Sequence, residues 1–208
     1  MKRKKGVVKV FFGVLAVTSI ISVIVFGENF ISLDSIKNKF LLGSIETEIT
    51  EKFDAPNEWN GSNINKKVSI KNTGKSSELI RVSLIPRWVD ENENPWAGDS
   101  NLIQLNLNEN NLASLDKDNI DDLWVDGKDG YFYYMAKLES GSVTKELLKS
   151  VEIKKDSIQN SLKEKYNGKK VKVDVKVEAI QPNKDALIKK WTIIDKNIEN
   201  KFLEILGA

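Results

Sequence analysis

The sequence predicts a mainly β protein, an antiparallel β-sandwich of about seven strands. Several short runs alternate apolar and polar residues, which is the period of a half-buried strand. Glycine, asparagine and aspartate separate these runs, as expected for tight turns. Helical patterns do not recur between the runs, so the sequence favours antiparallel pairing over a parallel α/β sheet.

The segment 66–88, KKVSIKNTGKSSELIRVSLIPRW, predicts two strands joined by a polar turn, as in a hairpin. Val68 and Ile70 lie on one face of the first strand. In the second strand the expected buried residues are Ile80, Val82, Leu84, Pro86 and Trp88, and the expected outer residues are Arg81, Ser83 and Arg87. Because proline lacks a backbone donor, Pro86 indicates an edge or a bulge.

Further strands are expected on both sides of this segment. Residues 171–179 give the cleanest alternation in the chain, with valines and Ala179 on one face and lysines and acids on the other. An aromatic strand over 131–138 is expected to pair with Trp124 and Val125, and Asn167-Gly168 is a hairpin signal. The remaining expected strands are 43–50, 102–107, which is weaker, and the mostly extended segment 143–153.

The C-terminal segment 183–208 predicts one amphipathic helix, with Asn183 as a possible cap. Apolar residues recur there every three or four positions: Leu187, Trp191, Ile194, Ile198, Phe202 and Ile205. Such an apolar stripe requires a partner surface.

The N-terminus predicts export. Four cationic residues in 2–5 precede an apolar run over 10–26, the layout of a signal peptide or an N-terminal membrane helix. We expect cleavage before Glu28, and the alternative is a retained anchor that crosses the membrane through residues 7–26. The predicted organisation is a signal or anchor over 1–27, an extended segment over 28–42, a β-sandwich over 43–182 and a helix over 183–208.

Composition excludes several kinds of chemistry. The chain has no cysteine and no histidine, which excludes disulfides, thiolate catalysis and Ser-His-Asp hydrolysis, and removes the usual zinc ligands. After residue 27 the chain holds 27 basic and 30 acidic residues, a net charge of about −3. This balance does not suggest a nucleic-acid partner, which requires clustered positive charge.

Candidate sites are weak. Asp90, Asn92 and Asn94 have the spacing of a calcium loop, but Pro95 and Asn101 stand where such a loop needs glycine and glutamate. A second acidic run over 116–129 is similarly ambiguous, and a solvated loop is favoured for both. The five tryptophans are expected in the core, with sugar stacking as the alternative. The sequence therefore predicts no catalytic residue, no cofactor and no metal ligand. We expect that the protein is not an enzyme.

Four segments in this order resemble the exported biofilm-matrix proteins of Gram-positive bacteria related to TasA and camelysin, most closely the BsaA-like branch. They are the signal leading to residues 40–49, the sequence VSIKNTG leading into 79–88, GSVTKELLKSVEI, and VEAIQ followed by Ala186 and Trp191. The resemblance implies export, cleavage by the dedicated signal peptidase SipW, and a jelly-roll-like or immunoglobulin-like sandwich. Camelysin is described as a metalloprotease, but the absence of histidine means that this activity is not expected here.

The resemblance also concerns assembly. In several relatives, subunits form fibres by inserting an N-terminal strand into the next subunit. The corresponding donor here is the segment 28–42, and the partners are the chain itself or related matrix subunits. The expected function is thus a non-catalytic structural protein of the cell surface or biofilm matrix. The alternative is a membrane-anchored, monomeric surface binding module similar to an adhesin.

Overall fold

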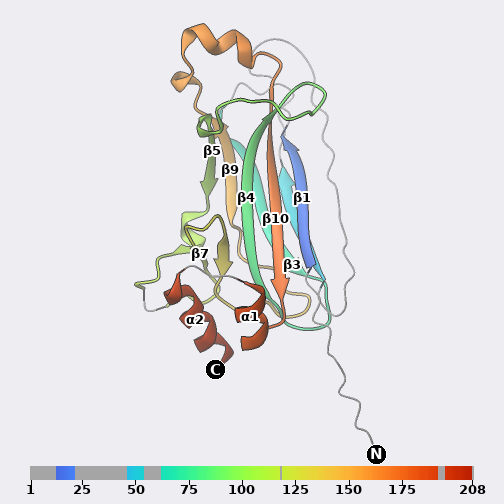
Figure 1. Cartoon of the computed structure of the whole chain (residues 1–208), viewed down its shortest axis with the longest axis vertical. Coiled ribbons are helices and arrows are strands. Elements are labelled where there is room, and N and C mark those ends of the chain that lie inside the picture. The colour runs from blue at the N-terminus through green and yellow to red at the C-terminus, as the bar shows by residue number, and fades with distance from the viewer. Residues whose placement is uncertain (1–12, 22–45, 54–61, 118, 192–194, 208) are drawn as a thin grey trace, which may run out of the picture.

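The computed structural model describes residues 13–21, 46–53, 62–117, 119–191 and 195–207, and these form a mainly β protein with two sheets and few helices (Figure 1). The larger sheet has the order β1-β10-β4-β8-β7-β6 and the smaller has the order β2-β3-β9-β5. Neighbouring strands are antiparallel except β6 and β7, which run parallel, so the larger sheet is mixed.

The elements have the following bounds. The six-stranded sheet contains β1 (Gly13–Ile21), β4 (Leu79–Val89), β6 (Leu112–Ala113), β7 (Trp124–Asp126), β8 (Phe132–Tyr134) and β10 (Lys170–Ile180). The four-stranded sheet contains β2 (Thr47–Phe53), β3 (Ile64–Asn72), β5 (Ile103–Leu107) and β9 (Leu148–Ile153). The helices are η1 (Ser100–Leu102), η2 (Glu109–Asn111), η3 (Lys155–Ser157), η4 (Asn160–Tyr166), α1 (Lys184–Lys190) and α2 (Lys196–Leu206).

The main core receives side chains from both sheets. Val68 and Ile70 of β3 belong to the same buried cluster as Val82 of β4 and Val175 of β10. The alternation predicted for residues 171–179 is confirmed, because all five apolar residues of that series are buried. Removing these side chains from water is the main favourable term for joining the two sheets.

The predicted hairpin of residues 66–88 is wrong in its pairing, although both strands exist. β3 lies between β2 and β9 in the smaller sheet, whereas β4 lies between β10 and β8 in the larger one. The connecting turn is fixed from outside, since the N–H groups of Thr73 and Gly74 both donate to the carbonyl of Glu46. Alternation defines the buried face of a strand but not its partner, so the pattern fits either arrangement.

Pro86 has a strand on one side of β4, where it pairs with Val173 of β10. On the other side, the described pairing of β8 with β4 extends over Arg81 and Val82. The expectation of a local edge at Pro86 is therefore confirmed, although β4 as a whole is an internal strand. The outer side of the strand is less exposed than expected, because Arg81 is buried.

Two other turn predictions have different outcomes. β7 and β8 pair as expected, with Val125 opposite Tyr133, but β8 is shorter than the predicted aromatic strand. Asn167 and Gly168 do not join two paired strands. They connect η4 to β10, with Gly168 in the left-handed region at φ 71°, a conformation that glycine adopts without steric cost.

Residues 13–21, within the segment expected as a signal or membrane helix, form strand β1 (Figure 1). This stretch, GVLAVTSII, is rich in β-branched residues, which favour strands over helices. The rest of the 1–27 segment and all of the predicted donor 28–42 lie outside the described residues. Within the described part of the chain, no helix combines the length and the apolar character needed to cross a membrane.

The C-terminal segment forms two helices instead of the single one predicted. The side chain of Asn183 caps α1 by accepting a hydrogen bond from the N–H of Ala186 at 2.8 Å, which confirms the expected cap. Trp191 ends α1 in an extended conformation, and Asp195 caps α2. Both helices contribute to a second buried cluster against the larger sheet, formed by residues such as Leu79, Tyr133, Leu187, Trp191 and Phe202.

Candidate functional site along strand β10

Strand β10 is bordered along both edges by other strands. β4 pairs with it over eleven residues, from Lys170 opposite Val89 to Ile180 opposite Leu79. β1 pairs with its other edge over nine residues, from Gly13 opposite Ala179 to Ile21 opposite Val171. Figure 1 shows the three strands side by side, with β1 at the margin of the sheet. The backbone edge of β10 is therefore occupied by part of the segment that the sequence analysis predicted to be an export signal or anchor.

The outer face of β10 carries a buried ion pair with β4. Arg81 donates from Nε and Nη2 to Oε2 of Glu178, at 2.9 Å and 2.6 Å. Both residues are less than a tenth exposed. Charge-assisted bonds of this kind are short and strong, and they compensate for the loss of hydration.

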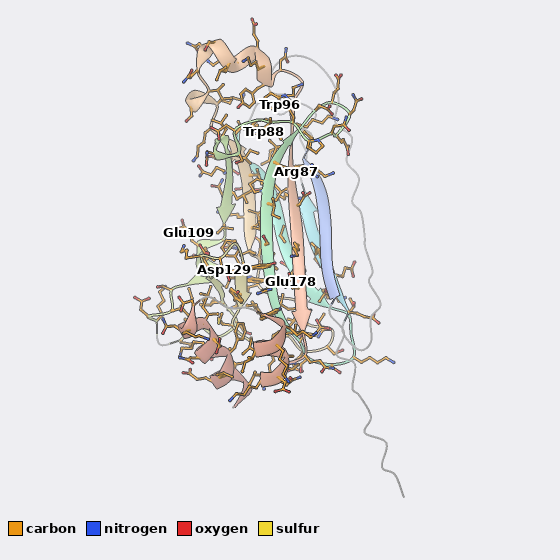
Figure 2. All side chains as sticks on the ribbon, viewed as in Figure 1. Arg87, Trp88, Trp96, Glu109, Asp129 and Glu178 are labelled. Carbon is orange, nitrogen blue, oxygen red and sulfur yellow. The ribbon has the colours of Figure 1, made fainter. Side chains whose placement is uncertain are left out.

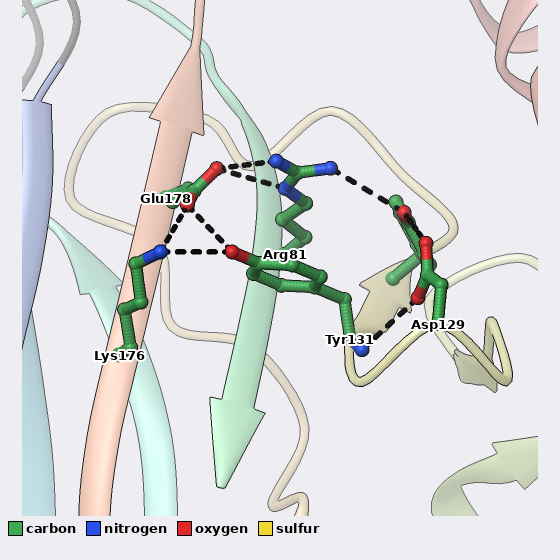
Figure 3. Close-up of polar contacts among 6 residues, drawn as sticks. Arg81, Asp129, Tyr131, Lys176 and Glu178 are labelled. Carbon is green, nitrogen blue, oxygen red and sulfur yellow. Dashed lines mark hydrogen bonds and ion pairs between the residues drawn. The ribbon is translucent and has the colours of Figure 1, made fainter. Parts of the chain in front are cut away.

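The second oxygen of Glu178 is also paired (Figure 3). The Tyr131 hydroxyl donates to Oε1 at 2.8 Å, and Lys176 Nζ lies 2.8 Å from the same atom. Burial alone would raise the pKa of Glu178, but hydrogen bonds from Lys176, Arg81 and Tyr131 outweigh it and lower this pKa. Lys176 Nζ also donates to the Tyr131 hydroxyl at 2.8 Å, and its hydrogen bonds to Glu178 first and to Tyr131 second raise the pKa of Lys176. Glu178 is thus held as an anion and is a poor proton acceptor.

Arg81 links this ion pair to the turn between β7 and β8. Its Nη1 donates to the Tyr133 hydroxyl at 3.4 Å, and that hydroxyl donates to Oδ2 of Asp129 at 2.6 Å. Burial, followed by the hydrogen bond to Asp129, raises the pKa of Tyr133. Oδ1 of Asp129 accepts the N–H of Tyr131, so one carboxylate fixes both tyrosines.

Aromatic side chains cover the guanidinium of Arg81. Its central carbon lies 4.0 Å from the centre of the Tyr131 ring and 5.1 Å from that of Trp191. Trp191 ends α1 and packs edge-on against Phe202 of α2. The helices therefore cover one side of this network, which acts as a structural clamp between β4, β10 and the turn after β7.

Ion pairs continue along the outer face of β10 toward its other end. Asp174 Oδ2 accepts from Arg87 Nε at 2.7 Å, and Lys172 Nζ lies 3.9 Å from Glu93 Oε2. In Figure 2, Arg87 lies along the same sheet as Glu178 and nearer the opposite end. Each described polar side chain on this face of β10 thus contacts β4, its following loop or Tyr131, which fixes the register of the two strands.

The calcium-like spacing at Asp90 has another explanation. Oδ1 of Asp90 accepts the N–H groups of Asn92 and Asn94, at 2.9 Å and 2.8 Å, and Oδ2 accepts from the Asn94 amide. Burial would raise the pKa of Asp90, but the hydrogen bonds from Asn94 and Asn92 outweigh it and lower this pKa. The carboxylate shapes its own loop, as aspartate often does in turns.

The second acidic run is dispersed in the structure. Asp126 contacts Lys128, Asp129 contacts Tyr133, and Asp122 accepts from the Tyr134 hydroxyl. Over the described ranges, no three acidic side chains gather in a way that could hold a metal ion.

Three of the five tryptophans, Trp88, Trp124 and Trp191, are buried, which confirms their expected place in the core. Trp96 packs edge-on against Tyr166, with ring centres 4.9 Å apart, near one end of the molecule (Figure 2). Trp59 lies outside the described residues.

Two features were not found from the sequence. Arg81 was expected on the exposed face, although the apolar stripe of the C-terminal segment indicated that some surface had to be covered. Glu78 is fully buried and has no sequence signal, since it follows a polar turn as an exposed glutamate would. Its Oε1 accepts the N–H of Glu46 at 3.0 Å, and burial raises its pKa to about 8.

Comparison with protein-family models, curated proteins and solved structures finds no match for this chain.

Proposed function

We propose that this chain is an exported, non-catalytic structural protein of the cell surface or biofilm matrix, with an antiparallel β-sandwich of jelly-roll or immunoglobulin-like type. In this proposal a signal peptidase similar to SipW removes residues 1–27. The support is the export pattern of the N-terminus, the resemblance to the TasA and camelysin proteins, and a core shared by two sheets.

The observation that carries the proposal is the pairing of β1 with β10 over nine residues. Cleavage before Glu28 would remove β1 and leave the N–H and C=O groups on that edge of β10 without a partner. An open edge accepts an extended strand from another chain, and main-chain hydrogen bonds supply the affinity. The proposed occupant is the N-terminal segment 28–42 of the next subunit, so that removal of the signal starts assembly.

The test compares the full chain with the chain that starts at Glu28. Under the proposal, the shortened chain forms oligomers or fibres in electron microscopy and elutes early in size-exclusion chromatography. A soluble peptide carrying residues 13–21 should block this assembly by occupying β10. The matched control is the same peptide with Val17→Pro, which lacks a ladder donor at its centre and should not block.

The proposal fails if the shortened chain remains monomeric at all concentrations, or if both peptides act equally. The alternative function is the membrane-anchored monomeric binding module. Its support is the poor cleavage sequence Val25-Phe26-Gly27, in which small residues are scarce. N-terminal sequencing separates the two functions: a start at Glu28 favours assembly, and Met1 retained in the membrane fraction favours the anchor.

A further inference from the structure

A groove rich in amide side chains lies on the four-stranded sheet, away from β10. Its volume is about 470 Å³, and five asparagines line it together with Leu107, Glu109, Lys149, Ser150 and Glu152. The asparagines are Asn63, Asn65, Asn106, Asn108 and Asn110. They come from β3, the loop before it, β5 and the segment that follows β5, so the fold gathers them from distant parts of the sequence.

Irregular strand pairing surrounds the centre of this groove. Ser150 of β9 pairs with Asn65 of β3 on one side and with Asn106 of β5 on the other. The register shifts immediately beyond both pairs, between Asn65 and Val68 and between Asn106 and Leu107. Such bulges twist a strand and redirect its side chains, and they are common beside functional sites.

Hydrogen bonds hold some of these side chains in place. Gln104 Nε2 donates to Asn106 Oδ1 at 2.7 Å, and Asn106 Nδ2 donates to Ser150 Oγ at 3.2 Å. Ser150 is only 2% exposed although it lines the groove. The base of the groove is therefore pre-organised, which reduces the entropy lost when a ligand binds.

The rim is less constrained than the base. Asn65 and Asn110 are exposed, and neither side chain makes a hydrogen bond to another described residue. Each amide offers two donors and one acceptor oxygen. A ligand that presents closely spaced groups able both to donate and to accept matches this rim.

We propose that the groove binds a neutral glycan through its hydroxyl groups. Hydroxyls donate and accept at the same atom, as amides do within one side chain, so the two sets are complementary. The charges at the groove, Glu109 and Glu152 against Lys149, leave a small negative excess, which disfavours phosphate-bearing or acidic ligands. This inference does not depend on strand exchange at β10.

The test is an NMR titration of the full ¹⁵N-labelled chain with two probes, cellohexaose and N-acetylated chitohexaose. At least one hexasaccharide should shift the side-chain amide signals of Asn65, Asn106 and Asn110 in a saturable manner. The double variant Asn65→Ala/Asn110→Ala should bind it about tenfold more weakly, since two neutral hydrogen bonds are lost. The matched control is Asn200→Ala, the same change on exposed α2 outside the groove, which should leave the affinity unchanged.

Both variants replace exposed side chains, and an unchanged unfolding temperature would show that they fold. The proposal is overturned if neither hexasaccharide gives saturable shifts, or if the double variant binds as tightly as the parent. It is also overturned if calcium chloride alone shifts the same amides and the sugars do not, because that result would assign the groove to a cation. Fibre formation plays no part in these measurements, so their failure is separate from failure of the proposed assembly.

Discussion

Arg81 of β4 and Glu178 of β10 form a buried pair in which two guanidinium nitrogens bind one carboxylate oxygen, at 2.9 Å and 2.6 Å. The pair joins the two longest strands of the larger sheet at the place where the C-terminal helices cover it. Its environment determines the effect of removing either partner.

Replacing Arg81 with methionine should destabilise the fold by about 3–5 kcal/mol, because it leaves the buried Glu178 carboxylate without its guanidinium partner, with only Lys176 and the Tyr131 hydroxyl beside it. Urea unfolding at neutral pH measures the loss. The matched control is Arg87→Met on the same strand, whose pair with Asp174 is partly exposed. That change should cost about 1 kcal/mol or less. Equal losses in the two variants would contradict the clamp.

A double-mutant cycle tests the same pair more directly. The variant Arg81→Met/Glu178→Leu should be more stable than Arg81→Met alone, since no buried carboxylate remains and the Lys176 ammonium, which is about a third exposed, can be hydrated. A double variant that is less stable than either single variant would show that packing, and not charge, dominates at this site.

Stability should fall as the pH rises through the range set by Glu78. The pKa of Glu78 is 4.5 in the unfolded chain and about 8 in the folded protein, so the folded state holds an extra proton between these two pH values. The contribution of Glu78 to the free energy of unfolding is fully present below pH 4.5 and is lost by about pH 8. This loss is on the order of a few kcal/mol. Unfolding by urea at pH 5 and pH 8 measures it.

Glu78→Gln is the control for this dependence, because it keeps the shape and cannot ionise. The difference in unfolding free energy between parent and variant should change across pH 4.5–8 and stay constant above pH 8. Glu178 contributes in a separate window: its pKa is lowered, so its stabilisation is lost only as the pH falls below 4.5. A parallel pH dependence in parent and variant would exclude Glu78 as the source.

Millimolar calcium should leave the thermal unfolding temperature unchanged. The oxygens of Asp90 already accept three hydrogen bonds from their own loop, so binding a cation there would first have to break them. A rise in unfolding temperature with calcium would show binding by mass action and contradict this interpretation.

The caps of the two C-terminal helices should contribute separately. Asn183→Ala removes the acceptor for the N–H of Ala186, and Asp195→Ala removes that for Asn197. Each change should cost about 0.5–2 kcal/mol in thermal or urea unfolding. If Asn183→Ala lowers the stability and Asp195→Ala does not, the capping of α2 contributes little to the free energy of unfolding.

The sequence predicted strands well where alternation was strong, but it predicted their partners less well: the pairing of β7 with β8 was expected, whereas the hairpin of β3 with β4 was wrong. Residues 171–179 and the two strands within 66–88 were identified because period-two patterns are local. The separation of β3 and β4 into different sheets was not identified, because it depends on Glu46 and on strands far along the chain. Two features of the sequence favoured a break in the C-terminal helix: the β-branched run Thr192-Ile193-Ile194 and the aspartate that follows it. The regular apolar spacing favoured one continuous helix, and the prediction followed the spacing.

Side-chain environments were harder to predict than strands. Arg81 lies on the outer face of β4 as expected. The C-terminal helices cover that face, and Trp191 and Phe202 belong to a second buried cluster there. The asparagine groove was not found because its members are far apart in sequence and asparagine is common in loops. Chemistry of this kind becomes visible only when the topology brings the residues together.

The connection from β3 to β4 has a mechanical consequence. It passes from one layer to the other between Asn72 and Leu79, and both of its ends bond to Leu138: the Asn72 amide donates to the Leu138 carbonyl, and Glu78 exchanges two backbone hydrogen bonds with that residue. Unfolding of either sheet would therefore break hydrogen bonds at this connection, so we expect the two sheets to lose their structure together. Heating or pulling should accordingly rupture the described β region in one step.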